Sequence, residues 1–346
     1  MDVTGRRRRR GELIAEVLAG SWRAEPPATT VTSDELAQVA PLLVATGAAG
    51  LAWRTARPRP DLLPVAARLR EAWLLEVGRE RLREELVAGL AAAAEAKGIE
   101  VLVYKGWAVA RHYPGPGLRP SDDIDVIVTA GDAPAVQAIS TDLPRIVLDV
   151  HRSPPPGLGT VGALLTRAQR VTVDGATIAI PAPADHLQMA AWHMFKHGGW
   201  RPLWLCDIAA MLEAGPVGRP PTDEPYASYW SVATALAASM LEARNDRGVA
   251  PEWVRRILAV EWGRPGFRAY GPLAASLRTS AVRAVAELPG RFPNRLAAAV
   301  TLGLPIGAEP DRTAPYRLIA RRLARRRPPG PRSDGPTDTS EEPGNT

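Results

Sequence analysis

The chain has 346 residues, of which 46% are hydrophobic and 23% charged, values that are ordinary for a soluble globular protein and leave room for two or more packed units. No apolar run approaches the roughly 20 residues of a membrane-spanning helix, and none follows Arg6–Arg10 as in a signal peptide. We therefore expect a cytoplasmic protein without a membrane partner. The single cysteine, Cys206, excludes an intrachain disulfide and stands in an apolar stretch, which predicts a buried thiol.

The net charge of +6 is concentrated at the two ends of the chain. Arg6–Arg10 supply five positive charges, and a second arginine run at 321–327 supplies five more, so the rest of the chain is slightly acidic. Such a distribution does not indicate a uniformly basic nucleic-acid-binding surface. Either run offers charge to RNA or to an acidic partner, but solvated and partly disordered ends are the simpler interpretation.

The first hundred residues are predicted to be helical behind a basic tail at 1–10. A helical pattern covers 11–57, with a helix start near Ser33-Asp34, and a second covers 61–97. Gly98 is a candidate for the residue that ends this second helix. The sequence therefore predicts a helical N-terminal region over 11–98.

The hydrophobic period changes after Gly98 and predicts an α/β unit over 99–182. Asp174-Gly175 separates two short apolar runs and is the strongest hairpin signal in the chain. The expected strands are 99–104, 123–128, 145–151, 170–173 and 176–180, and the expected helices are 107–113 and 133–140.

From Pro183 onward the pattern is helical again. The expected helices are 184–197, 203–214, 227–244, 251–261 and further segments to about 325. A tail at 328–346, rich in proline, glycine and charged residues, is expected to be disordered. The predicted fold is α+β: a small core at 99–182 between a helical region at 11–98 and another at 183–327.

Three aspartates carry the strongest chemical signal. Asp123 and Asp125 are two apart in a predicted strand, so they project from the same face while their apolar neighbours turn to the core. Asp149 lies in the next predicted strand and also points away from its apolar face. Carboxylates held together on rigid strands suit hard divalent cations. Two such ions about 4 Å apart support phosphoryl or nucleotidyl transfer and usually need three carboxylates.

Lys105 and Gly106 follow the first predicted strand and supply the second signal. A glycine there allows backbone N–H groups to approach a phosphate, and a helix beginning near Trp107 would point its positive end at the same place. Lys105 is one of only three lysines in the chain and would reach a phosphate oxygen as a point charge. The alternative is that Gly106 is merely a turn and Lys105 a surface charge.

The order of strand, glycine turn, helix, strand with Asp-x-Asp and strand with Asp resembles the DNA polymerase β-like nucleotidyltransferase superfamily. Within it the chain is most similar to the bacterial uncharacterised nucleotidyltransferase family, over about residues 90–215. The matching residues are Lys105-Gly106, Tyr113-Pro114, Gly117 to Pro120, Asp123-Ile124-Asp125, Val128, Asp149-Val150-His151, His193 to His197, Trp204 and Asp207-Ile208-Ala209.

The resemblance implies a mixed-sheet nucleotidyltransferase core in which Asp123, Asp125 and Asp149 bind metal and Gly106 faces the nucleotide phosphates. Trp107 stands where the superfamily usually has a serine. The phosphate contact of that serine would then come from Lys105, Arg119 or the backbone.

Histidines and a tryptophan complete the candidate set. His193 and His197 share a face of one predicted helix, which would lend His197 or Lys196 to the cleft. A zinc site with His186 is not indicated, because no cysteine or acid stands at a ligand spacing. His151 shares a face with Asp149 and would orient it or the substrate, or would be structural. Trp107 would stack on a base or belong to the core.

We therefore predict a nucleotidyltransferase that depends on magnesium, or alternatively on manganese, and that binds ATP or another NTP. It would move a nucleoside monophosphate from an NTP to an unknown acceptor and release pyrophosphate, with Lys105 and Gly106 on the β- and γ-phosphates. Relatives often stand in biosynthetic gene clusters, so the acceptor would be a small molecule, a peptide or a glycan precursor. The alternative is a degenerate, non-catalytic module that binds a nucleotide or a partner; the three acids favour the enzyme and Trp107 favours the module.

Overall fold

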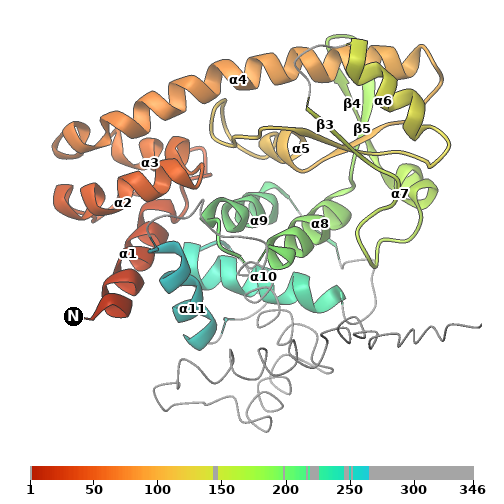
Figure 1. Ribbon diagram of the computed structural model, residues 1–346. Helices are drawn as coiled ribbons and strands as arrows, with labels where there is room; N and C mark the ends of the chain where they lie inside the picture. The colour runs from red at the N-terminus through yellow and green to blue at the C-terminus, as the bar shows by residue number, and fades with distance from the viewer. Residues whose placement is uncertain are drawn as a thin grey trace, which may run out of the picture. The chain divides into compact units, whose positions relative to one another are not determined.

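A computed structural model describes residues 2–142, 147–197, 199–215, 217–218, 226–244, 249–250 and 252–264. The expected helices between 265 and 325 and the expected tail at 328–346 lie outside the described residues. Within them the chain forms helices and one mixed β-sheet (Figure 1). The predicted α+β architecture is confirmed.

Four α-helices and a short 3-10 helix precede the sheet. They are α1 (Val3–Leu18), α2 (Ser33–Ala45), α3 (Ala49–Ala56), η1 (Pro60–Leu62) and α4 (Leu63–Glu95). Helix α2 begins with a capping box, in which Thr32 and Glu35 satisfy each other's backbone N–H groups. Residues 3–10, expected as a basic tail, belong to α1, where Arg8 and Arg9 meet Glu12 and Glu35.

Five strands form the sheet in the order β3-β2-β1-β5-β4. The strands are β1 (Leu102–Tyr104), β2 (Ile124–Ile127), β3 (Leu148–His151), β4 (Gln169–Val173) and β5 (Ala176–Ile180). Strand β2 pairs antiparallel with β1 and parallel with β3, whereas β5 pairs parallel with β1 and antiparallel with β4. Asp174 and Gly175 both have positive φ, as a tight hairpin requires, so the hairpin prediction is confirmed.

Helices cover both faces of the sheet. Those between its strands are α5 (Gly106–Ala110), α6 (Ala133–Asp142) and α7 (Val161–Arg167), of which α7 was not expected. Val126 and its same-face neighbours pack against α4 and α6, and Ile127 packs on the other face with residues of α7 and α8. Because β2 is covered on both faces, all four of its residues are buried.

The C-terminal helices are α8 (Pro183–Lys196), α9 (Pro202–Ala214), α10 (Tyr226–Leu241) and α11 (Glu252–Trp262). They share a second core with α1, α2 and α3, in which Cys206 is fully buried as expected. Helix α4 contacts α2 and α3 near its start and α5, α6 and β5 further on, so it joins the helical core to the sheet (Figure 1). None of the described helices combines the length and the apolar character needed to cross a membrane.

Candidate active site

Two acids meet on neighbouring strands of the sheet. Strands β2 and β3 run parallel with Asp125 opposite Asp149, so both carboxylates leave the same face. His151, two residues along β3, joins them. One donor atom from each of Asp125, Asp149 and His151 lies within 4.8 Å of the other two. The predicted convergence of Asp125 with Asp149 is therefore observed, with a histidine as the third member.

Asp125 is the centre of this cluster and is only 4% exposed. The Lys105 ammonium donates to its Oδ1 at 2.5 Å, and Nε2 of His151 lies 3.2 Å from the same oxygen. Nε2 of His151 is also 3.0 Å from Oδ2 of Asp149, whose side chain is 55% exposed. Burial by itself would raise the pKa of Asp125, but the contacts with His151 and Lys105 outweigh burial and lower it.

Lys105 carries backbone strain. Its φ of 56° and ψ of −146° lie in a region that is almost restricted to glycine, and strain of this kind gathers at functional sites. The conformation turns the chain from β1 into α5 and directs the Lys105 side chain to Asp125. Helix α5 has only five residues, so the Lys105 ammonium contributes more positive charge to this turn than the helix dipole does.

Gly106 is needed for a close approach. A Cβ atom at this position would lie 2.4 Å from Oγ of Ser121, well inside contact distance. Any larger residue would push the Ser121 loop away from the Lys105 turn.

Asp123 lies immediately before β2 and outside the cluster of three. Its carboxylate Oδ1 is 3.3 Å from Oγ of Ser121, and it is half-buried. Burial, and next the negative charge of Asp125, raise the pKa of Asp123, against a smaller opposing effect of the Ser121 hydroxyl. The structure thus keeps Asp123 beside the cluster without placing it among the three converging groups.

Trp107 and Arg119 are engaged elsewhere. Trp107 is 2% exposed in the core between the sheet and α4, and its indole N–H donates to Glu84, so its ring offers no face for a base. Arg119 is buried and donates to Asp207 through Nε and Nη2 at 3.2 and 2.9 Å. The Tyr113 hydroxyl donates to the same carboxylate at 2.8 Å.

A small pocket lies beside this ion pair and reaches Lys105. Its lining includes Lys105, Arg119, His186, His193, Trp204 and Asp207. His186 is fully buried, which lowers its pKa to about 3, and its Nε2 has no hydrogen-bond partner among the described residues. His197 packs against His193 and Trp204 at ring distances of 4.6 and 5.5 Å, and the side chain of Lys196 lies outside the described part of the chain.

Sequence reasoning missed the part played by Ser121. Ser121 has no role in the predicted site, although it stands two positions before Asp123. Only the fold brings its hydroxyl against Gly106. A small polar residue just before an Asp-x-Asp strand was the available signal.

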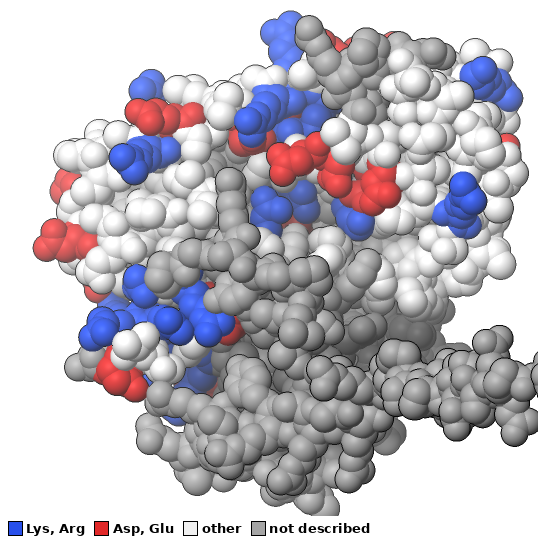
Figure 2. All heavy atoms as spheres, viewed as in Figure 1, with Lys and Arg blue, Asp and Glu red and all other residues white. Residues whose placement is uncertain are grey.

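The donors of the cluster suit a divalent metal. Two carboxylates and an imidazole form a mixed oxygen and nitrogen set, which manganese accepts more readily than magnesium does. Near α5, one face of the molecule shows acidic side chains directly beside basic ones (Figure 2).

Comparison with known proteins gives one family. A family model described as "Uncharacterised nucleotidyltransferase" matches residues 32–143 and 143–244, more than half of the chain. A solved structure, that of an antigenic nucleotidyltransferase-like protein from Paracoccidioides brasiliensis, is similar at 16% identity and a TM-score of 0.36. The match covers 49% of this chain and 95% of that one, and a score of this size does not establish a shared fold. A search of curated proteins finds no match.

Proposed function

Because the chain belongs to the uncharacterised nucleotidyltransferase family, we propose that it transfers a nucleoside monophosphate from an NTP to an acceptor hydroxyl and releases pyrophosphate. The observation that carries this proposal is the register of β2 and β3, which sets Asp125 opposite Asp149 with Lys105 at 2.5 Å from Asp125. Two acids that lie opposite each other on neighbouring strands, beside a lysine on a strained turn, lower the stability of the fold. A purely structural role therefore does not explain them.

A divalent metal fits the acids better than the protein's own cations do. Lys105 and His151 both approach Oδ1 of Asp125, and its Oδ2 has no hydrogen bond from any residue in the described part of the chain. Asp125, Asp149 and His151 would hold the metal, and Asp123 would add a further oxygen. A bound metal would polarise the α-phosphate and neutralise the charge that develops there. Manganese or magnesium is the expected ion.

The residues of the chain would then perform the positioning and the proton transfer. The acceptor oxygen attacks the α-phosphorus, the bond from that phosphorus to the β-phosphate oxygen breaks, and pyrophosphate leaves with the bonding electrons. Asp149, the most exposed of the three cluster residues, would take the proton from the acceptor hydroxyl. Lys105 and the backbone at Gly106 would contact the β- and γ-phosphates.

Pyrophosphate release tests the proposal. Each of the four NTPs would be incubated with manganese or magnesium and with pools of small molecules, peptides and glycan precursors. We expect release with at least one pair, and its loss in Asp125→Asn and Asp149→Asn. Asp122→Asn is the matched control, since Asp122 is an exposed neighbour outside the cluster. Turnover that survives both cluster substitutions would refute the site.

The degenerate module remains the competing function, and the buried Trp107 at the position of a serine favours it. It predicts tight NTP binding, measurable by calorimetry, with no pyrophosphate from any acceptor pool.

A further inference from the structure

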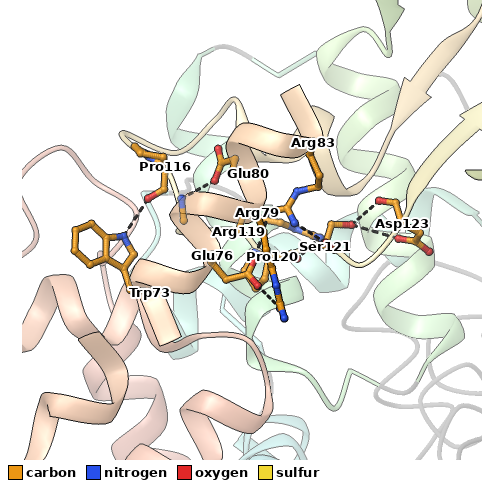
Figure 3. Close-up of polar contacts among 11 residues, drawn as sticks. Trp73, Glu76, Arg79, Glu80, Arg83, Pro116, Arg119, Pro120, Ser121 and Asp123 are labelled. Carbon is orange, nitrogen blue, oxygen red and sulfur yellow. Dashed lines mark hydrogen bonds and ion pairs between the residues drawn. The ribbon is translucent and has the colours of Figure 1, made fainter. Parts of the chain in front are cut away.

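Helix α4 presents a polar face to the loop that precedes β2. Trp73, Glu76, Glu80 and Arg83 are spaced by three or four residues, so they lie along one side of the helix. Figure 3 shows Trp73 pointing toward Pro116, Arg83 toward Ser121 and Glu80 toward the loop between them. The loop therefore lies on α4 over about three helical turns.

Three hydrogen bonds join α4 to this loop. The indole N–H of Trp73 donates to the carbonyl of Pro116 at 3.0 Å. The backbone N–H of Gly117 donates to Glu80 at 2.5 Å, and Nη1 of Arg83 donates to the carbonyl of Ser121 at 2.6 Å (Figure 3). All three use backbone groups of the loop, at Pro116, Gly117 and Ser121, so the loop path itself is held.

Arg83 is the best-fixed member of this face. It is 8% exposed, and its Nη2 lies 3.3 Å from Glu76, which also accepts from Arg79 at 2.8 Å. A guanidinium held on one side by a carboxylate has little freedom to leave the Ser121 carbonyl. By contrast, the side chain of Arg81 is 87% exposed, and its ion pair with Glu85 is long, at 3.8 Å.

Ser121 links the hydrogen bond from Arg83 to the candidate active site. Its hydroxyl lies 2.9 Å from the Asp123 carbonyl and 3.3 Å from the Asp123 carboxylate. On its other side Gly106 leaves room for it, and the next residue, Trp107, is tied to Glu84 of α4. Trp107 after the Lys105 turn and Ser121 before Asp123 thus contact consecutive residues of one helix, Glu84 and Arg83.

We infer that Arg83 is a positioning residue that sets Asp123 beside the metal cluster by holding Ser121. The inference rests on the proposed function, in which Asp123 adds a metal ligand. Residues that orient metal ligands typically change metal affinity or activity by 10- to 100-fold when removed. Arg83 would act in this way although it touches none of Asp123, Asp125 and Asp149.

Manganese binding tests the inference without any turnover. The signal of free Mn²⁺ in electron paramagnetic resonance would be followed as protein is added. We expect Arg83→Met to weaken Mn²⁺ binding by about 10-fold or more, in the range typical of such residues. Arg83→Lys should restore part of it, and Arg81→Met should leave it unchanged. Ser121→Ala, which removes only the hydroxyl, should also weaken Mn²⁺ binding. This variant takes the place of Arg83→Met if Arg83→Met does not fold.

A double substitution separates positioning from a general loss of structure. If Arg83 acts through Asp123, then Arg83→Met added to Asp123→Asn should weaken Mn²⁺ binding no further. An equal loss in both backgrounds, an unchanged affinity in folded Arg83→Met, or a wild-type protein that binds no Mn²⁺ would overturn the inference. Wild-type Mn²⁺ binding without pyrophosphate release would instead remove the proposed reaction and leave the effect of Arg83 measurable.

Discussion

Two buried ion pairs in this protein are built in different ways. Asp207 accepts from Arg119 and Tyr113, so both of its oxygens are occupied by protein donors. Asp125 accepts from Lys105 through Oδ1, and a second carboxylate, Asp149, stands beside it in register. The first pair is saturated, which is typical of a structural role. The second leaves Oδ2 of Asp125 without a hydrogen bond from the described residues, on the strand next to that of Asp149, and such an arrangement suits a bound cation.

The saturated pair gives the largest expected effect. Asp207→Asn leaves the buried Arg119 guanidinium without a charge partner, and such a loss costs about 3–5 kcal/mol of unfolding free energy. Urea unfolding followed by tryptophan fluorescence would measure it. The exposed pair of Asp61 with Arg59 provides the control, because Asp61→Asn should have little effect. Equal stability of the two variants would contradict the structural role of Asp207.

The pair of Lys105 and Asp125 should behave in the opposite way. Asp125→Asn is expected to lower kcat/KM roughly 1000-fold, since a metal site contributes several kcal/mol to the transition state. Its unfolding free energy should change less than that of Asp207→Asn, because Lys105 is 18% exposed and can turn to solvent. Steady-state kinetics and urea unfolding of both variants check this reversal. A similar loss of stability in the two would erase the distinction between the pairs.

The strained turn at Lys105 sharpens the comparison. Gly adopts its backbone angles freely, whereas a residue with a Cβ pays about 1–3 kcal/mol of strain. Lys105→Gly should therefore be more stable than Lys105→Ala by about 1 kcal/mol once the greater flexibility of glycine in the unfolded chain is included. Both should lose most activity. Thermal unfolding compares the two, and a more stable alanine variant would argue against strain at the site.

His186 lies in the pocket that touches both pairs and should give the smallest effect near neutral pH. Burial lowers its pKa to about 3 in the folded protein, against about 6.5 in the unfolded chain, so between these values the unfolded chain binds more protons. Its contribution is fully present above pH 6.5 and is lost as pH falls, by up to about 1.4 kcal/mol per pH unit. The unfolding free energy, measured with urea, should fall more steeply between pH 7 and pH 5 in wild type than in His186→Gln. Identical slopes would show that His186 does not stay neutral.

Much of the fold could be predicted because it follows from local patterns. Asp174-Gly175 specified a hairpin through its turn chemistry, and the change of hydrophobic period after Gly98 marked the α/β unit. Helix α7 was missed because its seven residues are too few for a clear period. The first two strands were predicted too long, since apolar residues such as Ile99 also pack outside the hydrogen-bonded ladder.

The candidate site was predictable in part. Strand alternation aimed Asp125 and Asp149 to one side, but their register depends on how β2 pairs with β3, which no local pattern specifies. The docking of Trp107 and Ser121 on α4 joins segments that are far apart in sequence, so only the fold reveals it. Arg119 was a candidate for the phosphate contact, yet its partner is Asp207, which lies 88 residues away.

The fate of labelled phosphates tests the central claim most directly. Wild-type protein would be incubated with Mn²⁺, the acceptor pools and NTP labelled either at the α- or at the γ-phosphate. The proposed site at Asp125 and Asp149 predicts that the α-label moves to an acceptor while the γ-label appears in pyrophosphate, and that Asp125→Asn abolishes both. Transfer of the γ-label to the acceptor, or α-label transfer that persists in Asp125→Asn, would contradict the account.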